Sequence, residues 1–177
     1  MAEAATATLN KPAWVDLATT DPAAARGFYA KVFGWNIEVN PDPQYGGYAL
    51  AKIGGHDAAG IGGMMSPEQP SAWSLYIGSD DLDALARRVT DAGGTVAMPA
   101  FDVGDQGKMA VFQDPTGAFF SAWQGTRMGG FQTDAPNSFD WAELTVDDDG
   151  LVTAYAEWQR TGYAIGPNET EPLDTVR

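Results

Sequence analysis

The chain has 177 residues, and its 24 Asp and Glu outnumber its 10 Lys and Arg, which gives a formal net charge of −14. Phosphate backbones are bound by lysine and arginine, so this charge argues against a nucleic-acid partner. The sequence has no Cys and one His, which excludes disulfides, thiolate metal sites, a cysteine nucleophile and any metal site with two histidines. A composition of 44% hydrophobic and 19% charged residues is typical of a globular protein.

The N-terminal segment, residues 1–11, is small and polar and is predicted to be disordered. It lacks the apolar stretch of a secretory signal, and no other run approaches the ~20 apolar residues of a membrane span. We therefore expect a cytoplasmic protein that does not bind a membrane.

A strand followed by a capped helix is predicted from Trp14 onward. The residues WVDLATTD alternate as in a strand, and the run PAAARGFYAKVFGW has the apolar spacing of a helix. Asp21 is the expected N-cap, and Gly34 is expected to end the helix. The apolar side chains that share one face of this helix are Ala25, Phe28, Tyr29 and Val32.

The same unit returns at residues 74–81 (SLYIGSDD), where Asp81 corresponds to Asp21 and Gly94 to Gly34. Leu82, Leu85 and Val89 provide the apolar stripe of the second helix. Three short strand-like runs follow each helix, at 35–39, 48–53 and 58–64, and at 95–98, 108–113 and 118–124. The sequence thus predicts an α+β fold of paired βαβββ modules, spanning residues 12–66 and 70–124.

A third copy begins after a turn-rich linker at 125–137. Residues 141–148 (WAELTVDD) match the first strand, and residues 151–163 (LVTAYAEWQRTGY) resemble the helix. We interpret 138–177 as a partial third module, a strand plus a helix, followed by a tail. This module could add to another chain, so a homodimer formed through it, or an assembly role, is one hypothesis.

A four-stranded sheet with a helix on one face leaves its other face uncovered, so the two copies are expected to surround a shared concave cleft. Alternation along the strands assigns one set of side chains to this cleft: Trp14, Asp16, Ala18, Ser74, Tyr76, Phe119, Ser121 and Trp123. The opposite, apolar set should face the helices: Val15, Leu17, Leu75, Ile77 and Phe120.

Three runs, DPAAARGFYAKVFGW, DDLDALARRVTDAGG and FQDPTGAFFSAW, resemble at this spacing the vicinal oxygen chelate superfamily. That superfamily includes glyoxalase I, extradiol dioxygenases and bleomycin-resistance proteins, and the chain is most similar to its tandem-domain glyoxalase-like branch. The resemblance covers 12–124, and 139–163 looks like the opening of a second such domain. It implies paired βαβββ modules around a cleft.

The resemblance also implies a divalent metal held by His, Gln or Glu on the first and last strand of each module. The matching positions here are Trp14, Ser74, Ser121 and one residue near 59–61. Indole cannot bind a divalent ion and serine is a poor neutral ligand, so we expect neither a metal nor another cofactor. His56 follows Gly54-Gly55 and is interpreted as an exposed turn residue.

The leading hypothesis is metal-independent binding of a planar aromatic or polyketide-like small molecule, for sequestration, resistance or carriage. Its predicted ligand-binding residues are Trp14, Asp16, Ser74, Tyr76, Phe119, Ser121 and Trp123. Alternatively, Trp14 and Trp123 are ordinary core or face a partner subunit.

A second hypothesis is a cofactor-free cyclase, isomerase or lyase of natural-product metabolism. Asp16 would be its general acid or base, and Tyr76 would donate a proton or hold a carbonyl oxygen. Metal-dependent glyoxalase or dioxygenase chemistry is a third, less favoured hypothesis. Whether the chain is an enzyme therefore stays open at the level of sequence.

Overall fold

The computed structural model of the chain describes residues 9–67, 69–128, 130–131, 136–140 and 142. Residues 1–8 of the predicted disordered terminus lie outside this part. So does most of the predicted third module, including the helix expected at 151–163.

The first module contains its elements in the predicted order. They are β1 (Pro12–Thr19), α1 (Pro22–Phe33), β2 (Asn36–Val39), the short 3-10 helix η1 (Pro43–Tyr45), β3 (Ala49–Ile53) and β4 (His56–Gly63). The Asp21 carboxylate accepts a hydrogen bond from the Ala24 amide at 2.9 Å, and Gly34 ends α1 with a φ of 70°. Both predicted caps of this helix are therefore confirmed.

The second module repeats the pattern with β5 (Ala72–Gly78), α2 (Leu82–Asp91), β6 (Thr95–Val103), β7 (Gly107–Gln113) and β8 (Phe119–Gly125). β6 extends beyond the predicted 95–98, although Pro99 lies within it. It is the last strand of the sheet, where a missing backbone N–H removes no necessary hydrogen bond. The pairing of β6 with β7 also shifts register on both sides of Met98, and this irregularity accommodates Pro99 in the strand.

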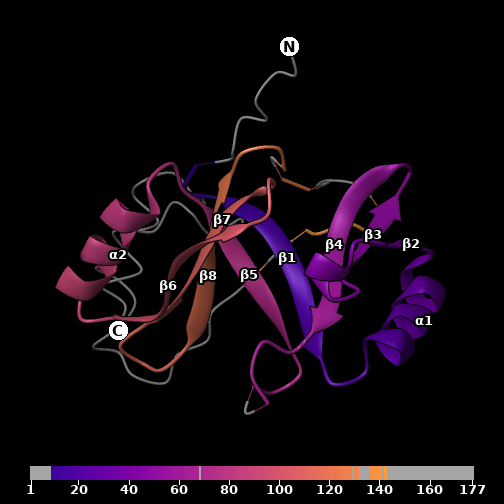
Figure 1. Ribbon diagram of the computed structural model, residues 1–177, viewed down its shortest axis with the longest axis horizontal. Coiled ribbons are helices and arrows are strands. Elements are labelled where there is room, and N and C mark those ends of the chain that lie inside the picture. The colour runs from indigo at the N-terminus through magenta and orange to yellow at the C-terminus, as the bar shows by residue number, and fades with distance from the viewer. Residues whose placement is uncertain (1–8, 68, 129, 132–135, 141, 143–177) are drawn as a thin grey trace, which may run out of the picture.

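The two modules form one mixed sheet with the order β2-β3-β4-β1-β5-β8-β7-β6 (Figure 1). Its centre is the antiparallel pair β1–β5, in which Trp14 is opposite Tyr76 and Asp16 is opposite Ser74. β4 runs parallel to β1, and β8 runs parallel to β5. The predicted α+β architecture is confirmed, and the pairing of β1 with β5 brings the first strands of the two modules side by side.

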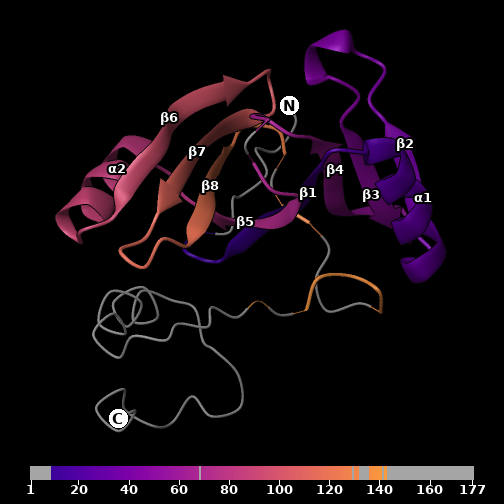
Figure 2. The same cartoon turned by 90° about the horizontal axis from the view of Figure 1, so that it is seen from below.

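The sheet is curved, and the two helices lie on its outer side (Figure 2). α2 covers an outer cluster that includes Phe112, Ala122 and Phe120. A second cluster, the inner cluster, contains Trp14, Tyr76, Met109 and Trp123 with partly buried Leu50 and Met128. Trp14, Tyr76 and Trp123 therefore lie on the face opposite Phe120, as the alternation of the sequence predicts.

The two helices differ in how much they bury. α2 buries Leu82 and packs Leu85 and Val89 into the outer cluster. None of the residues of α1, all of which the structure describes, is buried, and Phe28 and Val32 are 58% and 52% exposed. The apolar face predicted for this helix exists, but the described residues do not cover it. No helix among the described residues is long and apolar enough to cross a membrane.

The residues just before β1 are held in place by backbone hydrogen bonds. The Asn10 amide donates to the Gly78 carbonyl, and the Gly78 amide donates to the Lys11 carbonyl, both at 2.9 Å. Leu9 also forms a bridge with Gly78. The disorder predicted for 1–11 is therefore wrong for residues 9–11, because the end of β5 offers backbone partners that the sequence does not reveal.

The first part of the predicted linker is packed against the sheet. The amides of Thr126, Arg127 and Met128 all donate to the Gln106 carbonyl at 2.9–3.3 Å. The Trp123 indole N–H donates to the Met128 carbonyl at 2.8 Å. This segment therefore continues the fold beyond β8 and returns toward the inner cluster.

Candidate functional site

A carboxylate held by two tyrosines lies at the centre of the inner face. The hydroxyls of Tyr48 and Tyr76 each donate to Oδ2 of Asp16 at 3.1 Å. Asp16 is in the middle of β1, and its neighbours in register are Gly60 on β4 and Ser74 on β5. Residues from two strands, β1 and β5, and the residue just before β3 therefore meet at one oxygen atom.

The two tyrosines are themselves oriented by further donors. The indole N–H of Trp14 donates to the Tyr48 hydroxyl at 2.9 Å, so the proton of that hydroxyl is directed to Asp16. Ser121 is opposite Tyr76 in the sheet, and its hydroxyl acts to lower the pKa of Tyr76 against the raising effect of burial. We call Trp14, Asp16, Tyr48, Tyr76 and Ser121 the Asp16 network.

Sequence reasoning missed Tyr48, which immediately precedes β3. Its ring lies against the backbone of β4, where a Cβ added at Gly60 would be 1.7 Å from the tyrosine hydroxyl oxygen. A Cβ at Gly62 would be 2.8 Å from a ring carbon. The alternating glycines of the AAGIGG run were the available signal, because they leave one face of β4 without side chains.

Burial governs the ionisation of this site. It raises the pKa of Asp16 to about 6, against the lowering effect of the hydrogen bonds from Tyr76 and Tyr48. Burial and the nearby charge of Asp16 also raise the pKa values of Tyr48 and Tyr76 above their ordinary range. Near neutral pH both tyrosines therefore remain hydrogen-bond donors, while Asp16 can bind or release a proton.

The predicted ligand-binding residues differ in accessibility. Trp14, Tyr76, Ser121 and Trp123 are buried, whereas Asp16 and Ser74 are partly exposed, as is Tyr48. Phe119 is 67% exposed at the start of β8 and does not belong to the inner cluster. The structure therefore brings all but Phe119 of the predicted residues to the network or beside it. A small molecule would reach the carboxylate from the side of Tyr48 and Ser74.

The ring of Trp14 has an aromatic partner from the segment after β8. Phe131 packs edge-on against it, with ring centroids 5.8 Å apart and planes at 74°. Phe131 in turn contacts Phe139 at 5.1 Å. A ligand that stacks on this side of Trp14 must therefore displace Phe131.

The residues present do not fit a divalent metal. The four ligand positions that the resemblance implies are occupied by an indole, two serines and a backbone-only position, where Tyr48 fills the space above Gly60. The described part of the chain contains no group of three or more His, Asp and Glu side chains that could hold a metal ion. His56 is exposed and starts β4, next to Gly54 and Gly55 at positive φ, which confirms its interpretation as a hairpin residue.

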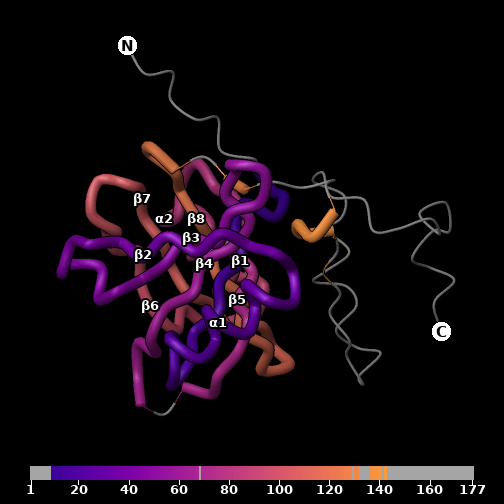
Figure 3. Tube along the Cα trace, turned by 90° about the vertical axis from the view of Figure 1, so that its right-hand side faces the viewer, coloured from indigo at the N-terminus to yellow at the C-terminus, as the bar shows by residue number. Residues whose placement is uncertain are grey.

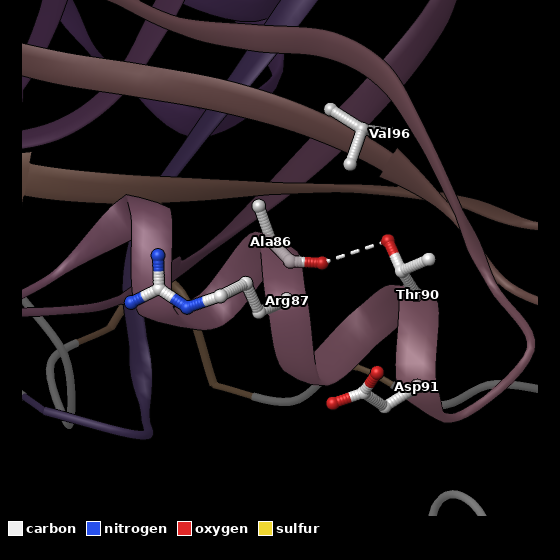
Figure 4. Close-up of a pocket in the computed structure, with 5 residues that line it drawn as sticks. All are labelled: Ala86, Arg87, Thr90, Asp91 and Val96. Atoms are coloured by element: carbon white, nitrogen blue, oxygen red, sulfur yellow. Dashed lines mark hydrogen bonds between the residues drawn. The ribbon is translucent and has the colours of Figure 1, made fainter.

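A shallow depression lies elsewhere, over α2 (Figure 4). Its lining residues are Ala86, Arg87, Thr90, Asp91 and Val96. The Thr90 hydroxyl donates to the Ala86 carbonyl at 3.0 Å within the helix. The depression shares no residue with the Asp16 network and offers no second polar group positioned by another strand.

Residues 11–121 match the Glyoxalase/Bleomycin resistance protein/Dioxygenase superfamily. The chain belongs to this superfamily. The match covers β1 to the first residues of β8, so the superfamily assignment includes every strand that contributes to the Asp16 network.

Curated proteins from Mycobacterium and Streptomyces are similar to this chain. CFP32 of Mycobacterium tuberculosis carries a provisional name as a glyoxylase. It is 43% identical to this chain over 151 residues, which cover 82% of this chain and 58% of CFP32. The anthracycline biosynthesis protein DauV of Streptomyces sp. (strain C5) is 36% identical over 174 residues, 90% of this chain and 62% of DauV. DnrV of Streptomyces peucetius, also named for anthracycline biosynthesis, is 39% identical over 156 residues, 80% of this chain and 57% of DnrV. The chain thus spans less than two thirds of the length of these relatives.

Solved structures share the fold of this chain at low sequence identity. The hypothetical protein BH1468 from Bacillus halodurans C-125 has a TM-score of 0.51 and 14% identity, covering 66% of this chain and 94% of that one. A variant of Streptomyces coelicolor methylmalonyl-CoA epimerase has a TM-score of 0.51 and 17% identity, covering 70% of this chain and 99% of the epimerase. These similarities concern the fold alone.

Proposed function

We propose that the chain binds a planar aromatic or polyketide-like small molecule at the Asp16 network without a metal ion. The observation that carries this proposal is the partly exposed Asp16 carboxylate, which two oriented tyrosines hold on the inner face of the sheet, in register with Gly60 and Ser74. The names of DauV and DnrV, which refer to anthracycline biosynthesis, support the ligand class. Such binding would allow the protein to sequester the molecule, to confer resistance to it or to carry it.

The chemistry of the site suits a ligand with a hydroxyl or enol at its edge. The carboxylate of Asp16 would accept a hydrogen bond from such a hydroxyl or enol. Ser74 lies beside Asp16 on β5. The aromatic rings of Tyr48 and Trp14 provide an apolar wall next to this polar point. A planar molecule would thus be oriented by one charged contact and held by rings.

Binding can be measured by titrating the full chain with a panel of planar hydroxyanthraquinones and following tryptophan fluorescence. We expect saturable quenching that is unchanged by EDTA and about tenfold weaker in Asp16→Asn. Asp83→Asn, at an exposed acid in α2, is the matched control and should bind like the wild type. Absence of quenching across the panel, or equal affinity of both variants, would contradict the proposal.

A specific observation also favours a second function, cofactor-free proton transfer in a cyclase, isomerase or lyase. The pKa of Asp16 is raised to about 6, which makes its carboxylate an effective base near neutral pH. The carboxylate would remove a proton from the carbon next to a ligand carbonyl, and the Tyr76 and Ser121 hydroxyls would stabilise the resulting enolate oxygen. The proton would then return from Asp16 to a different carbon or to the same one.

This second function is tested separately from binding. Incubation of enolisable ring ketones in D₂O, followed by NMR, would report exchange at the carbon next to the carbonyl. We expect Asp16→Asn to lower the exchange rate by about 100-fold or more, while a ligand still quenches fluorescence at higher concentration. Unchanged exchange in Asp16→Asn would remove the catalytic proposal and leave the binding proposal standing.

The location and the oligomeric state stay predictions. A cytoplasmic protein is expected from the sequence, and a homodimer through 138–177 would use residues that lie mostly outside the described part. Light scattering of the full chain measures the mass of the particle and tests the dimer directly.

A further inference from the structure

Five aromatic rings gather on the outer side of the sheet, around α1. We call Phe28, Tyr29, Phe33, Trp35 and Trp73 the α1 aromatic patch. Tyr29 lies at its centre, with ring centroids 5.0 to 6.1 Å from those of the other four. The indole N–H of Trp73 also donates to the Tyr29 hydroxyl at 3.1 Å. The patch is therefore an ordered surface built from α1, β5 and the residue before β2.

The patch is open to solvent in the described structure. Phe28 is 58% exposed, the neighbouring Val32 is 52% exposed, and Trp73 is 39% exposed. The corresponding face of α2 is packed into the outer cluster. Large apolar side chains gathered on one exposed face are typical of a surface that another segment covers.

The chain itself returns to this patch after β8. The Trp35 indole N–H donates to the Asn137 carbonyl at 2.7 Å. Residues 136–140, orange in Figures 2 and 3, run past the α1 half of the molecule. The last described residue, 142, follows soon after. From there the nine residues to Leu151 can span up to ~30 Å, starting from a segment that already contacts Trp35 of the patch.

The part of the chain beyond this point complements the patch in charge and in pattern. Residues 143–177 contain eight Asp and Glu and two Arg, whereas α1 carries Arg26 and Lys31 and no acidic residue. Leu151, Tyr155 and Trp158 have the i, i+4, i+7 spacing of one apolar helical face. An apolar helical face needs a surface to cover it, since short helices are marginal in water alone.

We propose that the α1 aromatic patch is the docking surface for residues 151–163 of the same chain. The apolar side chains of that segment lie over Phe28, Val32 and Trp73, and the acidic residues just before it, at 147–149, lie near the basic residues of α1. The hydrogen bond between Trp35 and Asn137 holds the chain that leads to residues 151–163 next to this surface.

The absence of native cysteines makes disulfide trapping in the full chain a direct test. Val32→Cys is combined with a second cysteine at Leu151, Tyr155 or Trp158, one pair at a time, and oxidised at low micromolar concentration. The control combines the same second cysteines with Arg87→Cys, which is on the outer side of α2 (Figure 4). We expect an intramolecular disulfide in at least one Val32 pair, formed at least tenfold faster than in the matched Arg87 pair.

Each alternative has its own outcome. Disulfide-linked dimers through Val32 would replace the proposal with docking of a second copy. Equal rates for the Val32 and Arg87 pairs, or no disulfide in any pair, would overturn it.

Hydrogen exchange of the full chain supplies a second readout without new cysteines. We expect Phe28→Ser to accelerate exchange of the amides of 151–163 by about tenfold. Phe119→Ser, which changes a ring that is 67% exposed on β8 in the other half of the sheet, should leave that exchange unchanged. Equal exchange in both variants contradicts docking on α1.

Discussion

The ring of Tyr48 occupies the space that a side chain at position 60 would need. An added Cβ at Gly60 would lie 1.7 Å from the Tyr48 hydroxyl oxygen and 2.9 Å from Cβ of Asp16. Gly60 therefore permits the hydrogen bond from Tyr48 to Asp16. The space on this face of β4 is therefore occupied by the ring of Tyr48.

Gly60→Ala should displace Tyr48 and destabilise the fold by about 1–3 kcal/mol, since overpacking forces the ring out of its position. Gly63→Ala is the matched control, because a Cβ there has no atom within 4 Å. Chemical denaturation would measure both variants. When Tyr48 is already replaced by Ala, Gly60→Ala should lower the free energy of unfolding much less. Equal stability of the two glycine variants would show that Tyr48 does not need this space.

Asp16 should make stability fall as the pH rises through 6. Its pKa of about 6 in the folded chain exceeds its ordinary value of 3.8, so the folded chain binds the proton more tightly. Its contribution to the free energy of unfolding is therefore fully present below pH about 4 and is lost progressively as the pH rises from about 4 through about 6. The loss is at most about 3 kcal/mol, since one pKa unit corresponds to about 1.4 kcal/mol.

Denaturation of the wild type and of Asp16→Asn from pH 4 to 7.5 checks this expectation. The stability of the wild type relative to Asp16→Asn should decline across that range. Parallel pH profiles for the two proteins would show that Asp16 has an ordinary pKa.

Removing either tyrosine hydroxyl should raise the pKa of Asp16 further, because each donates a hydrogen bond that favours the carboxylate. Tyr76→Phe should have the larger effect and Tyr48→Phe the smaller one. NMR titration of the Asp16 side-chain carboxyl carbon measures the shift. Tyr45→Phe is the control, since Tyr45 makes no contact with Asp16 among the interactions of the described residues. A lowered pKa in Tyr76→Phe would contradict the proposed role of its hydroxyl.

Phe131→Ala should expose the ring of Trp14 and strengthen the binding of planar aromatic ligands. The reason is that Phe131 packs against this ring in the described structure and must move for a ligand to stack there. Labelling with 5-fluorotryptophan and ¹⁹F NMR would follow Trp14, with its signal assigned by Trp14→Phe. If ligand affinity falls in Phe131→Ala, Phe131 is part of the binding surface rather than a competitor.

The sequence was sufficient for the architecture because its signals are local. Asp21 and Asp81 cap their helices, and the alternation on β1, β5 and β8 separates Trp14, Tyr76 and Trp123 from Phe120. The end of β6 was missed because a proline is excluded from a strand interior but tolerated at the edge of a sheet. Edge position is a property of the whole sheet.

The site was predicted in part for the same reason. Asp16, Tyr76 and Ser121 follow from strand alternation and from the resemblance to the superfamily. Tyr48 did not, since its role depends on the pairing of β3 with β4 and on the bare backbone of Gly60. Phe131 lies in a segment that reads as a linker, and only its contact with Trp14 reveals its place.

By itself, the sequence determined the repeated βαβββ modules, the face to which each strand residue points and the lack of metal-ligating side chains at the matching positions. These depend on residue type and on periodicity along the chain. Only the tertiary structure decided that Tyr48 shares Asp16 with Tyr76, and that the described residues cover the apolar face of α2 but not that of α1. Those relationships depend on which distant strands pair and on how much room their side chains leave, and no local pattern encodes either.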